Sequence, residues 1–378
     1  MTATQKIYDI IRKSGPISRI DIHRKFDLRP ATITRITELL INRNLICDCG
    51  KDCAAAGRTP ELLKINDSAF HVIGLHAVSN AVRGGIVSSA GKIKTYLTFS
   101  CPDSADKKRF LESLREAAQK LLENAAQNGI KISGIGLALP GEVDYNTGTL
   151  SKAAVILPGL ADIPCKTYLE NKFEMNVTVD HDTSMITQAE IFWGKANGCQ
   201  NTGTLFIGRG IGGSFFINGR LWRGARNRSG ELGHIPLRHA GPTCKCGLKG
   251  CFEALASISV IEKKYGVNIS FDEIVKRAAY GEKKAVAVLN EASGYIGEAI
   301  AIIFDILDIE LLVINGDIIA AEKLIREPVL DSFAAHVHSK QPLNKEFIAY
   351  SCFGQEVGVL GSAAAACHKA FAGFGIEI

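Results

Sequence analysis

One histidine and three cysteines in the middle of the chain have the spacing of a metal site. His234 is followed by nine residues, then by Cys244-Lys-Cys246-Gly, and Cys251 completes the group. Thiolate and imidazole groups are the ligands of tetrahedral zinc, and four of them leave no open position for catalysis. We therefore predict a structural zinc ion that also fixes the neighbouring Glu231 and Glu253. The alternative is four unrelated residues of a polar loop.

A second group of thiols, Cys47, Cys49 and Cys53, lies near the N-terminus without a fourth ligand beside it. The chain has eleven cysteines but begins with a stretch in which charges interrupt the apolar residues, unlike an export signal. Such usage favours reduced thiols or metal ligands over disulfides. We expect reduced loop cysteines here, with a metal or redox role as the alternative.

The charge of the chain is concentrated at one end. The 378 residues carry a net charge of +5, and the first 65 hold 12 Lys+Arg against 7 Asp+Glu. The rest of the chain is neutral, with 32 of each kind. This asymmetry suggests a small basic module on a neutral body, and nucleic acid is the usual partner of such a module. No apolar run is long enough for a membrane helix, so we expect a cytoplasmic protein without membrane contact.

Residues 1–66 have the pattern of a winged helix-turn-helix DNA-binding domain. Ile7, Ile10 and Ile11 have helical spacing, and Gly15-Pro16 ends that segment. Further helices are expected over Ser18–Phe26, with Ser18 as N-cap, and over Pro30–Arg43. Two short strands, at residues 45–46 and 62–65, complete the module.

Four residues of the third helix are placed to contact DNA: Arg29, Thr32, Thr34 and Arg35. Side chains near the start of a recognition helix reach base edges in the major groove, and nearby cations hold phosphates. Arg58 in the wing would enter the minor groove. The alternative is a small helical dimerisation domain whose arginines are only solvated.

The body, residues 70–378, alternates strands with crossover helices. Strands are expected at 71–78, 82–88, 93–100, 132–139, 177–179, 205–207, 215–218 and 311–314, with helices near 106–128, 184–194 and 282–307 and another opening at Gly316-Asp317. The glycine-rich segment 208–213 is expected as a loop. The repeated theme indicates a two-lobed α/β protein with a cleft. We place lobe one at about 70–182 plus the C-terminal helix, and lobe two at about 183–355.

Several motifs resemble the signature of the ROK family of repressors, open reading frames and kinases. The strongest runs from Gly230-Glu231-Leu-Gly-His234 through Cys244-x-Cys246-Gly to Cys251-x-Glu253. Gly134 to Asp144, Asp182 ahead of a helix, and Gly208-x-Gly210-Ile-Gly-Gly support it. The resemblance covers about residues 70–378 and implies an actin/hexokinase-like pair of ribonuclease-H-like lobes with sugar in the cleft. The winged helix is similar to that of the repressor branch, which includes the N-acetylglucosamine and xylose repressors.

The resemblance also separates kinase from sensor. Family kinases carry Asp-x-Gly-Gly-Thr between the first two strands, where this chain has His76, Val78, Ser79 and Asn80. Val does not readily adopt the positive φ that Gly supplies, and loss of the Asp removes a carboxylate that would organise Mg²⁺. Arg209 replaces the usual Thr of the second loop, an ambiguous change. We therefore expect no phosphoryl transfer, although Asp182 matches the family's catalytic base.

This chain matches the family better at the sugar-binding positions than at the phosphate loop. By resemblance they are Gly141, His181, Asp182, Glu231, His234 and Glu253, and carboxylates suit a polyol because each accepts two hydroxyls. Glu231 and Glu253 could alternatively only brace the zinc loop. The family usually has Asn at the positions of His181 and of Ile156, which precedes Leu157-Pro158-Gly159. We therefore expect the ligand to be an unusual sugar or a sugar derivative. The alternative is that the inducer response is lost.

These features favour a sugar-responsive repressor that binds double-stranded operator DNA as a homodimer or homotetramer. Two rivals remain: an active ATP-dependent sugar kinase with a fused DNA-binding domain, and a repressor controlled by a partner protein with a vestigial sugar site. The sequence does not name the sugar, the operator or the sign of the response.

Overall fold

The computed structural model of the chain describes residues 2–26, 28–51, 61–101, 106–153, 157, 159–266, 268–338 and 347–373. It divides into two compact units, one formed by 1–193 with 358–378 and the other by 194–357. The sequence predicts the lobe boundary after Asp182. The division instead falls after Trp193, because the helix that starts at Asp182 packs within the first unit.

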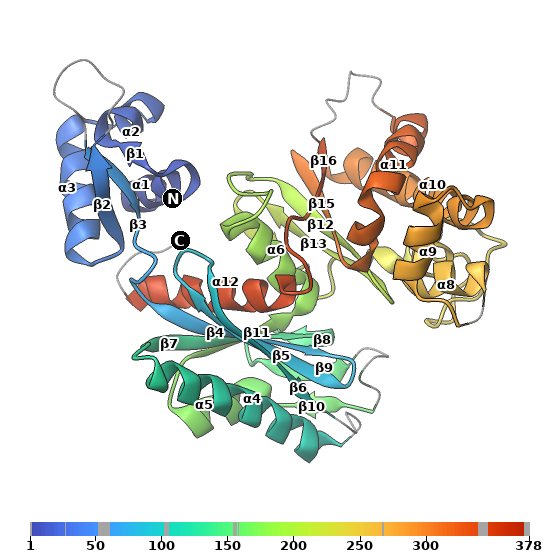
Figure 1. The fold of residues 1–378 in the computed structure, drawn as a ribbon, viewed down its shortest axis with the longest axis horizontal. Helices are drawn as coiled ribbons and strands as arrows, with labels where there is room; N and C mark the ends of the chain where they lie inside the picture. Colours follow the sequence, from blue (N-terminus) through green and yellow to red (C-terminus); the bar gives the residue numbers. More distant parts are fainter. Residues whose placement is uncertain are drawn as a thin grey trace. The chain divides into compact units, whose positions relative to one another are not determined.

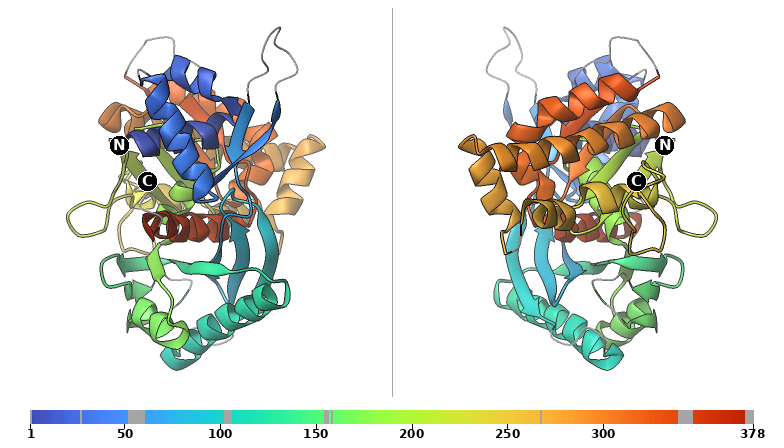
Figure 2. Two further views of the ribbon diagram at one scale, coloured as in Figure 1. Left: turned by 90° about the vertical axis from the view of Figure 1, so that its left-hand side faces the viewer. Right: turned by 90° about the vertical axis from the view of Figure 1, so that its right-hand side faces the viewer.

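The N-terminal segment folds as a winged helix (Figure 2). Its elements are α1 Ala3–Ser14, β1 Ile17–Ser18, α2 Arg19–Lys25, α3 Pro30–Asn42, β2 Ile46–Lys51 and β3 Glu61–Ile65. The strands form an antiparallel sheet in the order β1-β3-β2. Ser18 caps α2 as predicted, since its side chain accepts a hydrogen bond from the Asp21 N–H. Ile22, Ile33, Leu40 and Leu63 are buried and form the core of this segment.

The strand β2 differs from the prediction in one respect. It begins at Ile46 and continues to Lys51, so Cys47 and Cys49 belong to a strand and not to a loop. Both are free thiols, and Cys49 Sγ lies 3.3 Å from the Leu62 carbonyl oxygen. Cys53 lies outside the described residues.

The first unit contains a five-stranded sheet in the order β11-β7-β4-β5-β6. The strand β5 runs antiparallel to its neighbours β4 and β6, whereas β7 and β11 run parallel to β4. The bounds are β4 His71–Val78, β5 Ala81–Ser88, β6 Ile93–Ser100, β7 Ile132–Leu139 and β11 Val177–His181. These strands agree with the prediction, to which the structure adds two residues at the end of β11.

Helices cover both faces of this sheet (Figure 1). They are α4 Lys107–Gln127 and α5 Cys165–Phe173 on one face and α12 Val357–Gly373 on the other, and α6 Asp182–Phe192 follows β11 directly. A Cβ atom on Gly136 would overlap the Ser362 carbonyl, so glycine at this position lets α12 lie directly on the sheet. A small antiparallel sheet that the sequence did not predict adds β8 Gly141–Asp144, β9 Thr149–Ala153 and β10 Ala161–Ile163.

The second unit repeats the same sheet scheme, in the order β14-β13-β12-β15-β16. The central strand again has antiparallel neighbours on one side and parallel strands on the other. The bounds are β12 Thr202–Ile207, β13 Ile211–Ile217, β14 Arg220–Trp222, β15 Leu311–Asn315 and β16 Ile348–Tyr350. Two sheets of one topology confirm the predicted pair of ribonuclease-H-like lobes. The loop predicted at 208–213 is shorter, because β13 already begins at Ile211.

The helices of the second unit are α7 Phe252–Ala256, α8 Ile258–Tyr265, α9 Phe271–Ala279, α10 Lys283–Leu307 and α11 Glu322–His336, with 3-10 turns at Leu232–His234 and Asp317–Ala321. The helices α10 and α11 run side by side (Figure 1). Among the described residues, α10 alone has the length and hydropathy of a membrane span. Half of its most apolar window is buried inside the protein, as in a core helix.

Candidate functional site

The predicted metal ligands converge in the second unit. One ligand atom from each of His234, Cys244, Cys246 and Cys251 lies within 4.8 Å of all the others. The Cys246 and Cys251 sulfurs are 3.7 Å apart, as are Cys244 Sγ and His234 Nδ1. Zn–S bonds of about 2.3 Å in a tetrahedron place sulfurs roughly 3.8 Å apart, so the group has the dimensions of a closed zinc site.

Burial and the neighbouring thiols disfavour the charged form of one cysteine of this group. Burial, followed by the neighbouring Cys246 and Cys244 thiols, raises the pKa of Cys251 to about 12. A thiol in this environment ionises readily only when a metal stabilises the thiolate.

The two nitrogens of the His234 ring face different groups. Nδ1 faces the sulfur cluster, while Nε2 lies 3.9 Å from Glu231 Oε2. A ligating histidine commonly directs its second nitrogen to a carboxylate, which fixes the ring and its tautomer. The Glu231 side chain remains 60% exposed, so it has room to accept a further hydrogen bond.

Glu253, in the first turn of α7, contacts the glycine-rich loop. Its Oε2 accepts a hydrogen bond of 2.9 Å from the Ile211 N–H, and a Cβ on Gly210 would come within 3.0 Å of the same oxygen. The carboxylate thus braces the loop between β12 and β13. The other carboxylate oxygen still has acceptor capacity for a ligand.

His181 and Asp182 lie where β11 ends and α6 begins. Asp182 Oδ1 accepts from the Thr183 N–H at 2.7 Å and lies 3.4 Å from His181 Nδ1, which contacts the Thr183 hydroxyl at 2.7 Å. A carboxylate at a helix N-terminus is stabilised by the unpaired N–H groups and the helix dipole. The Asp182 side chain is 21% exposed, so it is accessible to a ligand.

Gly141 and His76 complete the predicted positions of the first unit. Gly141 opens β8 with φ at +119°, a conformation that favours glycine. The His76 side chain is buried. Its ring lies so close to Gly358 that a Cβ atom at that position would overlap it. Burial, with a smaller effect of Arg83, lowers the pKa of His76 to about 4, against the opposing charge of Asp182.

The six predicted sugar-binding residues therefore form two groups, each inside one unit. Gly141, His181 and Asp182 belong to the first unit, and Glu231, His234 and Glu253 to the second. Ile156 and Pro158 lie outside the described residues.

The predicted DNA-contacting surface of α3 is accessible. Arg29, Thr34 and Arg35 are exposed and Thr32 is half-buried, while Ile33 and Ile36 face the core. Arg58 lies outside the described residues.

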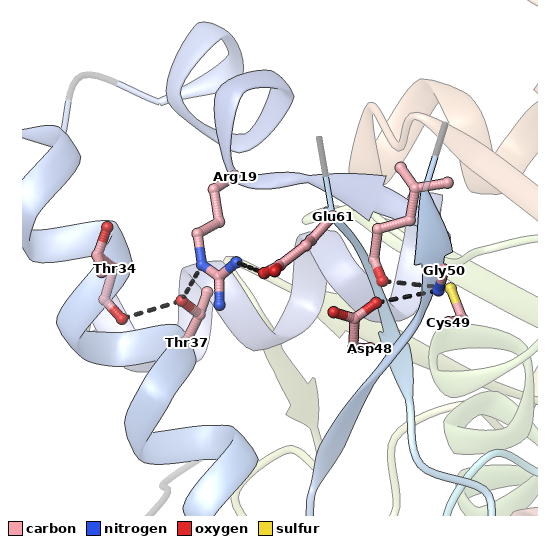
Figure 3. Close-up of polar contacts among 8 residues, drawn as sticks. Arg19, Thr34, Thr37, Asp48, Cys49, Gly50 and Glu61 are labelled. Atoms are coloured by element: carbon pink, nitrogen blue, oxygen red, sulfur yellow. Dashed lines mark hydrogen bonds and ion pairs between the residues drawn. The ribbon is translucent and has the colours of Figure 1, made fainter. Parts of the chain in front are cut away.

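Arg19 connects α2 to α3 and β3, a contact that the sequence did not reveal (Figure 3). Its Nε donates to the Thr37 hydroxyl at 2.9 Å, and its Nη1 donates to Glu61 Oε2 at 3.0 Å. One side chain thus holds α2, α3 and β3 together. No sequence signal identifies it, since its partners lie 18 and 42 residues away.

Comparison with known families agrees with this geometry. A model of the ROK family matches residues 73–369. The chain belongs to the ROK family. The DNA-binding transcriptional dual regulator NagC of Escherichia coli (strain K12) is 27% identical over 342 residues, which is 86% of this chain and 82% of that protein.

Solved structures of ROK proteins share this fold. A ROK family transcriptional regulator, a homologue of the Escherichia coli MLC protein, superimposes with a TM-score of 0.79 at 24% identity, covering 98% of this chain and 96% of the other. A ROK hexokinase from Thermus thermophilus has a TM-score of 0.68 at 27% identity, covering 80% and 100% respectively. The family model begins after the winged helix, which this chain therefore carries in addition to the ROK body.

Proposed function

We propose that this protein is a sugar-responsive transcriptional repressor. The winged helix binds operator DNA, and the ROK body binds a sugar or sugar derivative without phosphorylating it. The observation that carries the proposal is the combination in one chain of an exposed α3 face bearing Arg29, Thr34 and Arg35 with a ROK body. Such a regulator works where chromosomal DNA is, so we assign it to the cytoplasm.

The position of His76 supports the loss of phosphoryl transfer. Where family kinases have an aspartate, this chain has a buried imidazole whose pKa is lowered to about 4. It is uncharged at neutral pH, and carboxylate oxygens, not imidazole, suit Mg²⁺. The turn that follows contains no glycine, and Val78 precedes it. Neither the charge nor the backbone freedom for cradling ATP phosphates is present there.

The sugar ligands are proposed to be Gly141, His181, Asp182, Glu231, His234 and Glu253. Asp182 and Glu231 have accessible carboxylates, and His234 Nε2 points away from the metal group. Carboxylates and an imidazole supply acceptors and a donor for sugar hydroxyls.

The metal is proposed to be zinc with a structural role. It would be held by His234, Cys244, Cys246 and Cys251, all four positions being protein ligands. It would fix the segment that carries Glu231 and Glu253 and would take no part in chemistry.

For DNA we propose a homodimer or homotetramer on a pseudo-palindromic site. Two-fold symmetry would place recognition helices about 10–10.5 bp apart, or a multiple of that spacing. Arg58 of the wing is proposed as a minor-groove contact.

The test of DNA binding uses the full chain and a duplex enriched by it from a random-sequence library. We expect Arg35→Ala to weaken binding by about 1–3 kcal/mol, as the loss of a base contact does, without changing the melting temperature. Arg115→Ala, at a half-buried arginine of α4, is the control. Equal affinity of wild type and Arg35→Ala would refute the recognition-helix assignment.

A further inference from the structure

The helix α1 has a second face that the winged helix does not use. Ile7 and Ile11 are fully buried, in a helix that contacts α3 and β3. Tyr8 and Arg12 are likewise four residues apart, so they share one face of the helix. Tyr8 has no exposed surface and the Arg12 side chain is 8% exposed. Both side chains also contact residues outside the winged helix, in the body of the first unit.

Arg12 binds the C-terminal end of α6. Its Nη1 donates to the Ile191 carbonyl at 3.2 Å and to the Phe192 carbonyl, and its guanidinium lies 5.0 Å from the centre of the Phe192 ring. Its Nη2 donates to Asp9 Oδ1 at 2.9 Å. The last carbonyls of a helix lack partners within the helix and carry partial negative charge. A buried cation at this place therefore caps α6.

The other end of α6 is Asp182, the proposed sugar ligand. The helix has 11 residues and thus spans about 16 Å. A Cβ on Gly361 would overlap the Met185 carbonyl, so the backbones of α6 and α12 are in contact midway along α6. A helix packed in this way moves as a rigid element. A displacement at Asp182 therefore reaches the Arg12 contact.

Tyr8 makes the second contact, with α12. The centre of its ring lies 4.9 Å from that of Phe371 in an edge-on arrangement. The Phe70 ring also packs on Phe371, with the ring centres 5.0 Å apart. The Tyr8 hydroxyl is buried, and no group among the described residues pairs with it. An unpaired buried hydroxyl costs free energy. The packed arrangement is therefore less stable than its ring contacts alone would make it.

We propose that the Tyr8–Arg12 face of α1 is a latch between the DNA-binding module and the sugar-binding body. The idea rests on the proposed function and adds to it that sugar relieves DNA binding, so that sugar and DNA must favour opposite states. Sugar bound at Asp182 holds α6 in place and favours the closed latch, with Arg12 on the Ile191 and Phe192 carbonyls. DNA favours the open latch.

Two substitutions in this contact have opposite predicted effects. Arg12→Met removes the cap of α6 and opens the latch, so DNA affinity rises about fivefold, at the low end of allosteric coupling, and the sugar response is lost. Tyr8→Phe removes the unpaired hydroxyl and keeps the ring, which favours the closed latch and lowers DNA affinity. Arg12→Lys retains the cation but not the planar fork and should restore part of the response.

Arg115→Met serves as the matched control. Arg115 pairs with Glu112 three residues earlier, as Arg12 pairs with Asp9, but it lies on α4 and is less buried than Arg12. It should change neither DNA affinity nor the sugar response. Circular dichroism of each full-length variant verifies folding.

Trp193 provides a direct signal of the latch. It follows Phe192, and the two rings are 5.7 Å apart. The chain has two tryptophans, so Trp222→Phe leaves Trp193 as the only tryptophan, whose emission can be excited selectively. Addition of the enriched duplex should shift the Trp193 emission, N-acetylglucosamine or xylose should oppose that shift, and Arg12→Met should show the DNA-bound spectrum from the start.

The possible results separate the latch from the function on which it rests. Failure of the wild type to bind any duplex refutes the proposed function, and the latch with it. DNA binding without a change in Trp193 emission, or two substitutions that move DNA affinity in the same direction, overturns the latch alone. If neither sugar acts but DNA still shifts Trp193 emission and Arg12→Met mimics it, the latch is supported, and the choice of sugar is wrong.

Discussion

The two five-stranded sheets share one topology but differ at the first hairpin. In the first unit, β4 and β5 are joined by a tight turn in which Asn80 has φ at +56°, and His76 is buried beside it. In the second unit, Gly208, Arg209 and Gly210 connect β12 to β13, and the Ile211 N–H at the end of this loop binds Glu253. A hairpin that cradles phosphate needs free N–H groups and flexible backbone.

Neither hairpin combines free N–H groups with a flexible backbone. The first has lost its glycines, and in the second a carboxylate already accepts from a loop N–H. Under the proposed function, one sheet topology serves ligand binding here and phosphoryl transfer in family kinases, and a few residues of two loops would separate the functions. Four substitutions test how far the two units differ.

The largest difference should appear on removal of the metal. Cys246→Ser should abolish zinc binding and destabilise the second unit by about 3 kcal/mol or more, because zinc binding contributes directly to folding. The first unit contains no such group among its described residues. Zinc content by atomic spectroscopy and thermal melting check this.

Cys352→Ser is the control, since Cys352 is an exposed free thiol of the same unit. A Cys246→Ser protein that keeps its zinc or its full stability would refute the structural metal.

The second effect belongs to the first unit and depends on pH. Because the pKa of His76 is about 4 in the folded protein and about 6.5 when unfolded, the unfolded state binds more protons between these values. The free energy of unfolding should therefore fall as pH decreases through this range, by about 2 kcal/mol from pH 7.5 to pH 5. His76→Gln should remove that part of the dependence in urea unfolding.

His336→Gln, at an exposed position, is the control for the loss of a histidine. If the wild type and His76→Gln lose stability in parallel, His76 is not buried in its neutral form.

A smaller effect distinguishes bracing from ligand binding at Glu253. Glu253→Gln should cost about 1 kcal/mol of stability, because a neutral acceptor binds the Ile211 N–H less strongly than a carboxylate, and it should also weaken sugar binding. Glu262→Gln is a close match, since Glu262 accepts from the Phe271 N–H at 3.0 Å. It should lose similar stability without affecting the sugar. Sugar affinity by calorimetry that is equal in both variants would leave Glu253 as a brace only.

The smallest effect concerns the turn of the first unit. Asn80→Gly should change the free energy of unfolding by less than about 0.5 kcal/mol, because both residues tolerate positive φ. Asn80→Gly should not produce ATP hydrolysis, because His76 still occupies the position where family kinases have a charged aspartate. Urea unfolding and a phosphate-release assay test both points, and measurable hydrolysis would show that the turn alone limits the chemistry.

The sequence predicted most of what is locally encoded. The segments 71–78 and 93–100 have the hydrophobic patterns of strands, and both are strands in the structure. Ser18 and Asp106 occupy helix N-caps, and the helices that follow them agree closely with the predicted ones. The metal group was predictable because its four ligands lie within eighteen residues.

The remainder depends on contacts between distant segments. The strand β13 begins inside the glycine run because Gly213 packs against Leu232, and no local pattern shows this. Arg12 looks like an ordinary basic residue of a DNA-binding module, yet two of its partners are 179 and 180 residues away. The short strands β8 to β10 pair with one another and have little periodicity of their own.

The most direct test of the central claim is a thermal-shift screen of the purified protein against sugars, amino sugars, polyols and sugar phosphates, with and without Mg-ATP. A ligand at 100 times its dissociation constant adds about 2.7 kcal/mol to stability, which raises the melting temperature visibly. We predict stabilisation by a sugar or derivative that does not depend on Mg-ATP, without formation of ADP. ADP formation that Asp182→Asn abolishes would show an active kinase, and no response to any sugar by the folded protein would contradict the proposed sugar control.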